Sequence, residues 1–295
     1  MHIYNMLFEY QNGNYKVRIY NDGTKIRFTD DDEFVPLFPE SIDLKITNRC
    51  DLRCSMCHEL SSPSGKDADL NHPFLSTLKK GTELAIGGGN PLDHKKLVPF
   101  LKRMKKQGVI CNITVNQVHL IKEKDLILSL IENKLIHGLG ISVTNDLFLD
   151  EIIKFAGFYR NSVIHLIAGI IDENTLNKLK DNNLKILFLG YKQIGRGKDY
   201  YSFEVEEKIK FIEKNIMDIS SSFEIVSFDN LAIKQLKMKE KILDFDEKYM
   251  GDDGQFTMYI DLVKEEFSIS STNEIRFKMT QDIESMFNVV RNYQK

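Results

Sequence analysis

From about residue 41 onward, short apolar runs alternate with longer stretches in which apolar residues recur at helical spacing. This alternation is typical of βαβ units, whose strands form a parallel sheet covered by helices. Most of the runs are apolar throughout, as strands covered on both faces should be. Their uneven spacing, without a recurring motif, indicates a barrel or partial barrel rather than a repeat solenoid. The predicted strands are 42–46, 83–86, 110–115, 139–143, 163–167, 185–189 and 223–226.

The segments on either side of these units have a different pattern. Asn12-Gly13 and Asp22-Gly23 are hairpin-turn dipeptides between strand-like runs, which predicts a β meander near the N-terminus. Near the C-terminus the pattern predicts a β-hairpin within 259–269 and a helix near 282–293. We therefore expect three parts: an N-terminal β extension at 1–40, a core barrel at 41–230, and C-terminal helices with a hairpin at 231–295 that close the barrel.

Composition narrows the class of protein. The chain has 295 residues, of which 42% are hydrophobic and 28% charged, and 40 basic against 43 acidic residues give a net charge of −3. These values disfavour both disorder and extensive nucleic-acid binding. No apolar run approaches the roughly 18 to 20 residues that a membrane-spanning helix needs, and the N-terminus lacks the features of a signal peptide. We expect a soluble, cytoplasmic protein that does not bind membranes.

Three of the four cysteines, Cys50, Cys54 and Cys57, lie within eight residues directly after the first predicted strand. Clustered thiols in a reducing compartment indicate metal binding, and active sites of parallel α/β folds lie at this end of the strands. Three thiolates can hold three irons of a cubane cluster and leave the fourth iron open to another ligand. The fourth cysteine, Cys111, opens an apolar run, and we expect it to be buried and structural.

The ends of the later strands carry glycines and polar residues. Gly87-Gly88-Gly89 directly follows the second strand, and a backbone without Cβ atoms allows close approach of a ligand. The loop 190–197 after the sixth strand combines three glycines with Lys192 and Arg196, so it either cradles an anionic group or is a solvated connection. His165 lies inside an apolar run and is expected to be a core histidine, while His58 and Glu59 are expected to be structural.

The cysteine spacing, its place after the first strand and the glycine run together resemble the radical S-adenosylmethionine (radical SAM) superfamily, over roughly residues 40–230. The resemblance implies a partial (β/α)6 TIM-like barrel in which the three cysteines bind a four-iron four-sulfur (4Fe–4S) cluster. It also implies that SAM chelates the open iron. One electron from the cluster would then cleave SAM to methionine and a 5′-deoxyadenosyl radical, and this radical would abstract hydrogen from a substrate. The partner would be a low-potential electron donor such as flavodoxin or ferredoxin.

The resemblance also implies roles for single residues. Met56 stands where an aromatic residue commonly packs near the adenine of SAM, and Asn90 stands where the glycine motif usually has an acidic residue. Tyr191 is a candidate relay or hydrogen donor, and Lys192 a candidate contact to the substrate. The expected SAM-binding residues are Met56, Gly88, Gly89, Asn90, Asn116, Ser142 and Gly169.

Several alternatives remain at this stage. Three cysteines and His58 could form a Cys3His zinc site, although adjacent Cys57 and His58 would strain one tetrahedron. The chain could also bind a cluster without turning over SAM. Within the enzyme hypothesis we favour a peptide or other small substrate, since the N-terminal meander offers an edge for strand addition. A nucleoside or nucleotide is the alternative, supported by lysine-rich stretches at 95–106 and 234–241. Because Cys111 should face away from the site, cysteine-quenched epimerisation is less favoured than oxidation, bond formation or rearrangement.

Overall fold

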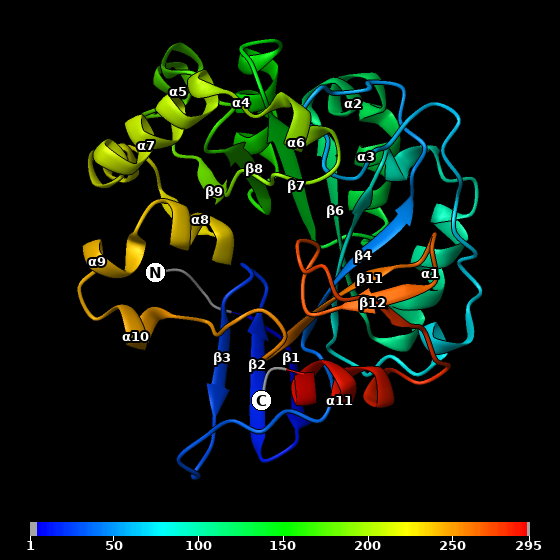
Figure 1. Ribbon diagram of the computed structural model, residues 1–295. Coiled ribbons are helices and arrows are strands. Elements are labelled where there is room, and N and C mark those ends of the chain that lie inside the picture. The colour runs from blue at the N-terminus through cyan, green and yellow to red at the C-terminus, as the bar shows by residue number, and fades with distance from the viewer. Residues whose placement is uncertain (1–4, 294–295) are drawn as a thin grey trace.

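Parallel strands form the centre of the computed structural model, which describes residues 5–293 (Figure 1). In the described part of the chain, a ten-stranded sheet has the order β10-β9-β8-β7-β6-β5-β4-β11-β12-β13. Every ladder from β10 to β11 is parallel. The core strands are β4 (Ser41–Thr47), β5 (Glu83–Gly88), β6 (Ile110–Asn116), β7 (Gly138–Val143), β8 (Ser162–Ile167), β9 (Lys185–Leu189) and β10 (Ile225–Phe228). The predicted α/β fold with a curved parallel sheet is confirmed.

Six of the seven predicted strands lie within the strands observed, and the seventh is shifted toward the C-terminus by two residues. We expected it at 223–226, whereas β10 begins at Ile225. Phe223 belongs to the turn that ends the preceding helix, because its N–H donates to the Ser220 carbonyl. Its ring still packs partly buried against the core, which explains why the apolar pattern included it.

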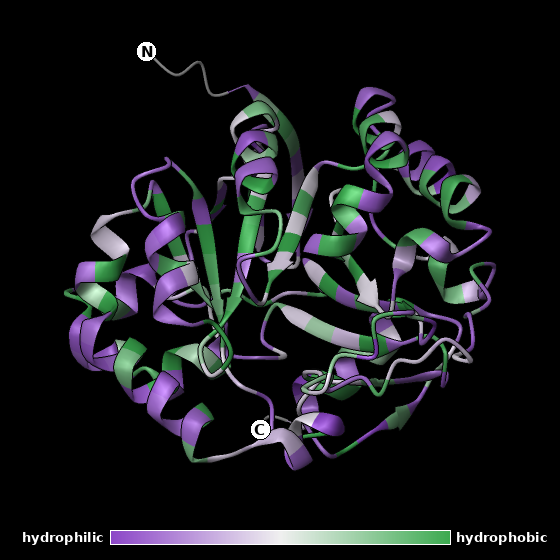
Figure 2. Ribbon diagram, turned by 90° about the horizontal axis from the view of Figure 1, so that it is seen from above, coloured by the Kyte–Doolittle hydropathy of each residue, from purple (hydrophilic) through white to green (hydrophobic). Residues whose placement is uncertain are grey.

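Helices cover the outer face of the sheet, and their polar sides face outward (Figure 2). The longer connection helices are α1 (Leu97–Gln107), α3 (Lys124–Glu132), α4 (Leu149–Phe158) and α7 (Phe203–Ser221). The shorter ones are η1 (Pro73–Ser76), η2 (Pro91–Asp93), α2 (Gln117–Lys122), α5 (Glu173–Leu179), α6 (Arg196–Tyr200) and α8 (Asn230–Gln235). In α1 the apolar side chains at 97, 100, 101 and 104 are buried and the basic ones lie outside, as helical periodicity predicts.

The inner face of the curved sheet is more polar than we expected. In β4 the side chains of Ile42, Leu44 and Ile46 are buried under the helices. Asp43 and Lys45 alternate with them and line a cavity inside the barrel. Successive side chains of a strand point to opposite faces, so β4 has one apolar and one polar face. The strands are therefore not uniformly apolar, because a partial barrel encloses an interior that is not a packed core.

Residues 6–28 form the predicted meander, a separate antiparallel sheet. Its strands are β1 (Met6–Asn12), β2 (Tyr15–Tyr20) and β3 (Lys25–Phe28). Tyr15 packs edge-on against Phe256, just before β11, and the same apolar cluster includes Ile110 at the start of β6. The meander therefore covers the N-terminal ends of the parallel strands, where Figure 1 shows it below them in blue.

The C-terminal segment adds three strands to the main sheet. The elements are α9 (Met238–Lys241), α10 (Phe245–Lys248), β11 (Thr257–Asp261), β12 (Glu266–Ser268), β13 (Phe277–Lys278) and α11 (Ile283–Tyr293). The hairpin β11–β12 and the last helix agree with the prediction. We expected this segment to close the barrel; instead β11 pairs in parallel with β4 and widens the sheet, and no ladder joins β10 to β13 within residues 5–293. None of the helices described is both long and apolar enough to cross a membrane.

Candidate functional site

The cysteine loop starts where β4 ends, at the carboxyl edge of the parallel sheet. Cys50, Cys54 and Cys57 are free, half-buried thiols that line one cavity of about 450 Å³. Burial raises the pKa of Cys50, and burial together with the two neighbouring cysteines raises the pKa of Cys54. Cys50 and Cys54 are therefore held as protonated thiols in the free protein, and metal binding would release their protons.

The glycine run packs against the start of this loop. The N–H of Gly89 donates to the Thr47 carbonyl at 2.7 Å. A Cβ on Gly88 would lie 2.4 Å from the Thr47 oxygen, and one on Gly89 would lie 2.1 Å from the Arg49 oxygen, so neither position has room for a side chain. Gly87 differs, because it lines the cavity and a Cβ there would meet nothing within 4 Å. The later two glycines bring the cysteine loop close, and Gly87 widens the cavity.

The loop after β9 also contacts the cysteine loop. Arg196 donates from Nε to the Cys54 carbonyl and from Nη2 to the Ser61 carbonyl, each at 2.9 Å. Its backbone N–H donates to the Cys57 carbonyl at 3.1 Å. Gly195 has a φ of 57°, and a Cβ there would lie 2.4 Å from a carbonyl oxygen of the cysteine loop. Arg196 and Gly195 therefore position the cysteine loop, a role that the sequence did not suggest.

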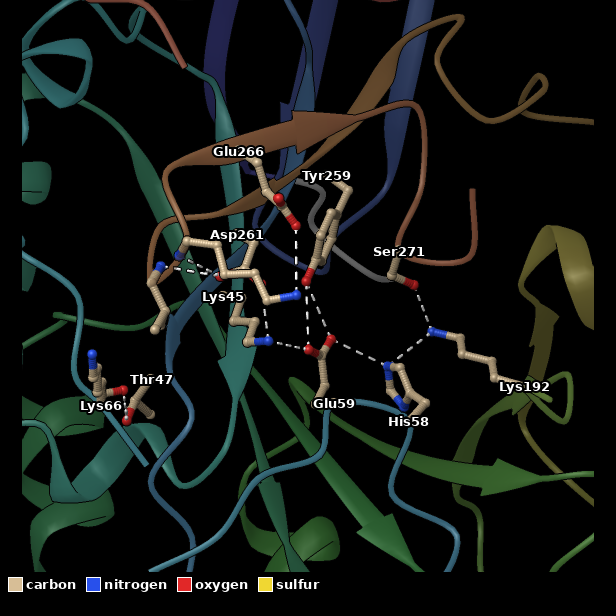
Figure 3. Close-up of polar contacts among 12 residues, drawn as sticks. Lys45, Thr47, His58, Glu59, Lys66, Lys192, Tyr259, Asp261, Glu266 and Ser271 are labelled. Carbon is tan, nitrogen blue, oxygen red and sulfur yellow. Dashed lines mark hydrogen bonds and ion pairs between the residues drawn. The ribbon is translucent and has the colours of Figure 1, made fainter. Parts of the chain in front are cut away.

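Charged side chains from two strands anchor the segment that follows the cysteines (Figure 3). Lys45 Nζ lies 2.6 Å from Glu59 Oε2 and 3.0 Å from Asp261 Oδ2. The Tyr259 hydroxyl donates to Glu59 at 3.3 Å. Burial opposes ionisation of Glu59, but the contacts with His58 and Lys45 outweigh it and hold the pKa of Glu59 well below its usual range. This network fixes the loop to β4 and β11.

His58 and Lys192 extend the network into the cavity. Lys192 Nζ donates to Ser271 Oγ at 2.8 Å and to His58 Nε2 at 3.4 Å, and the same ring nitrogen lies 3.3 Å from Glu59. Burial and the charge of Lys192 lower the pKa of His58. The His58 ring is therefore directed at Glu59 and Lys192, and both His58 and Glu59 line the cavity as well as supporting the loop.

Two predicted SAM-binding residues lie side by side. Asn116 and Ser142 are partners in the β6–β7 ladder, and both line the cavity. His165 is the partner of Ser142 in β8 and also lines the cavity. We expected His165 to be a satisfied core histidine; its ring instead makes no hydrogen bond with the residues described, and burial lowers its pKa to about 4. A neutral imidazole is thus available inside the barrel.

Other predicted residues lie away from the cavity. Tyr191 is 2% exposed, and its hydroxyl donates to the Gly197 carbonyl at 2.7 Å, so it is a core residue and we do not propose it as a catalytic group. Tyr191 forms a small apolar cluster with Ile170 and Val205, and Met56 packs against this cluster. A Cβ on Gly169 would lie 2.6 Å from a methyl group of Val205, so this glycine faces that cluster as well.

Asn90, the departure from the usual glycine motif, is a capping residue here. It is fully buried, and its Oδ1 accepts the Leu92 N–H at the start of η2. Its Nδ2 has no hydrogen-bond partner among the residues described. The side chain is not part of the cavity wall.

Three charged residues on inner strand faces were not expected from the sequence: Asp43, Lys45 and Asp261. A signal was present, because polar and apolar residues alternate in Ser41–Thr47. This alternation indicates a strand with one polar face. Asp261 and Tyr259, which lie two residues apart on β11, could not be placed near the cysteines from the sequence, because about 200 residues separate β11 from the cysteine loop.

Comparison with known proteins supports the same fold. No protein-family model matches the chain. Solved structures of SuiB from Streptococcus suis are similar: the complex with the precursor peptide SuiA has a TM-score of 0.62 at 15% identity, covering 86% of this chain and 65% of that one. The complex with S-adenosylmethionine has a TM-score of 0.60 at 15% identity, covering 83% and 64%.

One curated protein shows local sequence similarity. It is the tungsten-containing aldehyde ferredoxin oxidoreductase cofactor-modifying protein of Pyrococcus furiosus, 34% identical over 80 residues. The match covers 25% of this chain and only 22% of that protein. The chain thus spans less than two thirds of the length of this relative and of the SuiB chain in the two complexes. The structural similarities and the parallel sheet show that the chain has the partial α/β-barrel fold of SuiB, with the cysteine loop at the carboxyl edge of that sheet.

Proposed function

We propose that the protein is a radical SAM enzyme that cleaves S-adenosylmethionine reductively and abstracts hydrogen from a peptide or another small substrate. One observation carries this proposal. The three thiols, the open backbone at Gly87, and the polar pair Asn116 and Ser142 all line the same cavity at the carboxyl ends of the strands. Parallel α/β barrels place their active sites at this end.

The thiols suit a cluster of several irons better than one metal ion. Sulfur ligands on a single tetrahedral zinc, with bonds of about 2.3 Å, would lie roughly 4 Å apart. Within residues 5–293, the only three potential ligand atoms found within 4.8 Å of one another belong to Cys50, Asp51 and His119, so the three cysteine sulfurs are not gathered this closely. The His58 ring is directed at Glu59 and Lys192. Both features count against a Cys3His zinc site.

The residues of the chain have separate tasks in this proposal. A 4Fe–4S cluster held by the three cysteines would supply the electron and the open iron for SAM. Arg196 and the glycine run hold the cysteine loop in place through its backbone carbonyls and N–H groups. Asn116 and Ser142 offer hydrogen bonds to the ribose or carboxylate of SAM. The clustered thiols suit a reducing, cytoplasmic setting and an electron donor such as flavodoxin or ferredoxin.

A peptide substrate is supported by the similarity to SuiB, whose structure was solved with a precursor peptide. The edge of the N-terminal meander, where strand addition of a peptide was expected, does not support a peptide substrate, because this sheet lies at the opposite end of the barrel from the cysteines. A nucleoside substrate remains the alternative. The lysine-rich stretch at 95–106 that suggested it lies mostly on the outward side of α1, away from the cavity.

The test is anaerobic reconstitution with iron and sulfide, followed by reduction and chromatography for 5′-deoxyadenosine after adding SAM. We expect about four irons per chain and product in the parent protein, and neither full iron loading nor product in Cys54→Ala. Cys111→Ala is the matched control and should keep both, since Cys111 is buried at the other end of its strand. Zinc in place of iron, or full iron loading without product under strong reductant, would contradict the proposal.

A further inference from the structure

Asp43 places a carboxyl group in the cavity, and no side chain among residues 5–293 forms a hydrogen bond or an ion pair with it. It precedes Lys45 by two residues on β4, so it lies on the same inner face but deeper in the barrel. Its ladder partners are Ala85 on β5 and Tyr259 on β11. Within residues 5–293 it forms no side-chain hydrogen bond and no ion pair.

The cations that face Asp43 are held by other groups. Lys192 acts on Asp43 through its charge, yet its Nζ donates to Ser271 and His58 (Figure 3). Lys45 forms ion pairs with Glu59 and with Asp261 of β11. Neither lysine lies within ion-pair distance of Asp43.

A second carboxyl group makes this part of the cavity more acidic. Asp229 also lines the cavity, and its Oδ1 accepts the backbone N–H groups of Gly190 and Ala232. No ion pair involves Asp229 within the described part of the chain. Burial raises the pKa of Asp43 to about 6 against the charge of Lys192, and the charges of Asp253, Asp229 and Glu59 act in the same direction as burial.

Asp43 lies inside the barrel, yet its side chain is exposed to the open cavity rather than packed against other residues, so its carboxylate is accessible to a ligand. We propose that Asp43, helped by the charge of Asp229, binds a cationic hydrogen-bond donor of the substrate, either a primary ammonium or a guanidinium group. This inference deepens the proposed function and rests on it, because it names the chemical group that the substrate presents inside the barrel. Basic peptide side chains and free small amines both carry such a group.

Binding can be measured on the reconstituted protein without reductant, so that no turnover is needed. The probes are the acetylated, amidated forms of lysine and of norleucine, which differ in the ammonium group, and free butylamine. At neutral pH we expect the lysine amide to bind at least about tenfold more tightly than the norleucine amide, the range of a charged hydrogen bond. Asp43→Asn should abolish this preference, and Asp150→Asn, an exposed carboxylate on α4, should keep it.

A second variant separates lost recognition from misfolding. Lys192→Met removes a competing positive charge and should tighten binding of the lysine amide, whereas a damaged cavity would weaken it. Tighter binding of the lysine amide than of butylamine identifies a peptide side chain, and the reverse order identifies a free amine. Equal affinity of the parent and Asp43→Asn for the lysine amide, or no detectable binding, overturns the inference. Neither result bears on SAM cleavage, which the 5′-deoxyadenosine measurement decides separately.

Discussion

The two ends of the barrel each contain a cluster of charged side chains, but only the N-terminal cluster is complete. There the Glu40 side chain is 1% exposed and contacts Arg27 at 2.7 Å, Lys25 at 3.3 Å and the Tyr15 hydroxyl at 2.6 Å. At the C-terminal end, Lys45 is fully paired, whereas Asp43 and the cysteine thiols face the cavity.

The difference indicates what each end contributes. Buried ionic groups that satisfy one another hold elements together, and groups left unsatisfied around a cavity are available to ligands. The same division applies generally to barrels, in which the N-terminal face stabilises and the C-terminal face carries the chemistry. The comparison therefore predicts that substitutions at the two ends affect different measurements.

The largest effect on stability is expected at the N-terminal cluster. Glu40→Gln leaves Arg27 and Lys25 without their buried partner and should lower the free energy of unfolding by about 3 kcal/mol. Burial opposes ionisation of Glu40, but Arg27, Lys25 and Tyr15 outweigh it and lower its pKa. Its stabilisation is therefore present above pH 4.5 and is lost as the pH falls through the lowered value, where parent and variant should converge.

Urea unfolding of Glu40→Gln at several pH values, with iron content measured in parallel, checks this prediction. Glu9→Gln is the matched control, because Glu9 forms an exposed ion pair with Arg18 and should change nothing measurable. Loss of iron binding in Glu40→Gln at unchanged stability would break the comparison between the two ends.

A smaller effect, on a different measurement, is expected from Arg196→Met. The substitution removes two hydrogen bonds to carbonyls of the cysteine loop and should weaken iron loading about tenfold, as is usual for groups that orient metal ligands. The urea midpoint should change little. Lys198→Met, an exposed residue of the same short helix α6, is the control and should load iron normally. Iron titrations that give identical curves for parent and Arg196→Met would show that the loop is positioned without the guanidinium.

The smallest effect is a gain in stability at the C-terminal end. The raised pKa of Asp43 means that its ionised form disfavours the folded state. Asp43→Asn should therefore stabilise the protein by about 1 kcal/mol, a value reduced for the access of water to the cavity. The gain should be absent below about pH 4, develop between about pH 4 and the raised pKa of about 6, and persist above it. A pH series of urea midpoints for parent and variant measures it, and a loss of stability at neutral pH would show that Asp43 is already neutralised within the protein.

Much of the fold could be predicted because it depends on local patterns. The alternation of apolar runs and helical stripes located the core strands, with one shifted by two residues where Phe223 enters a turn. The cysteine spacing and the glycine run located the candidate site, since the ends of parallel strands converge at one edge of the sheet. Tyr191 shows the limit of this reasoning: its loop was placed at the correct edge, but its side chain turns into the apolar cluster.

The sequence alone determined the βα order, the meander, and the position of three thiols and three glycines at strand ends, because each depends on residues close together in the chain. Only the tertiary structure decided which strand faces line the interior, that β11 joins β4 across some 200 residues, and that Arg196 holds the cysteine loop. These contacts depend on how distant segments pack, and the same local pattern is compatible with several packings. Asp43 illustrates both sides: its place on a strand was readable, but its lack of a partner became apparent only inside the folded barrel.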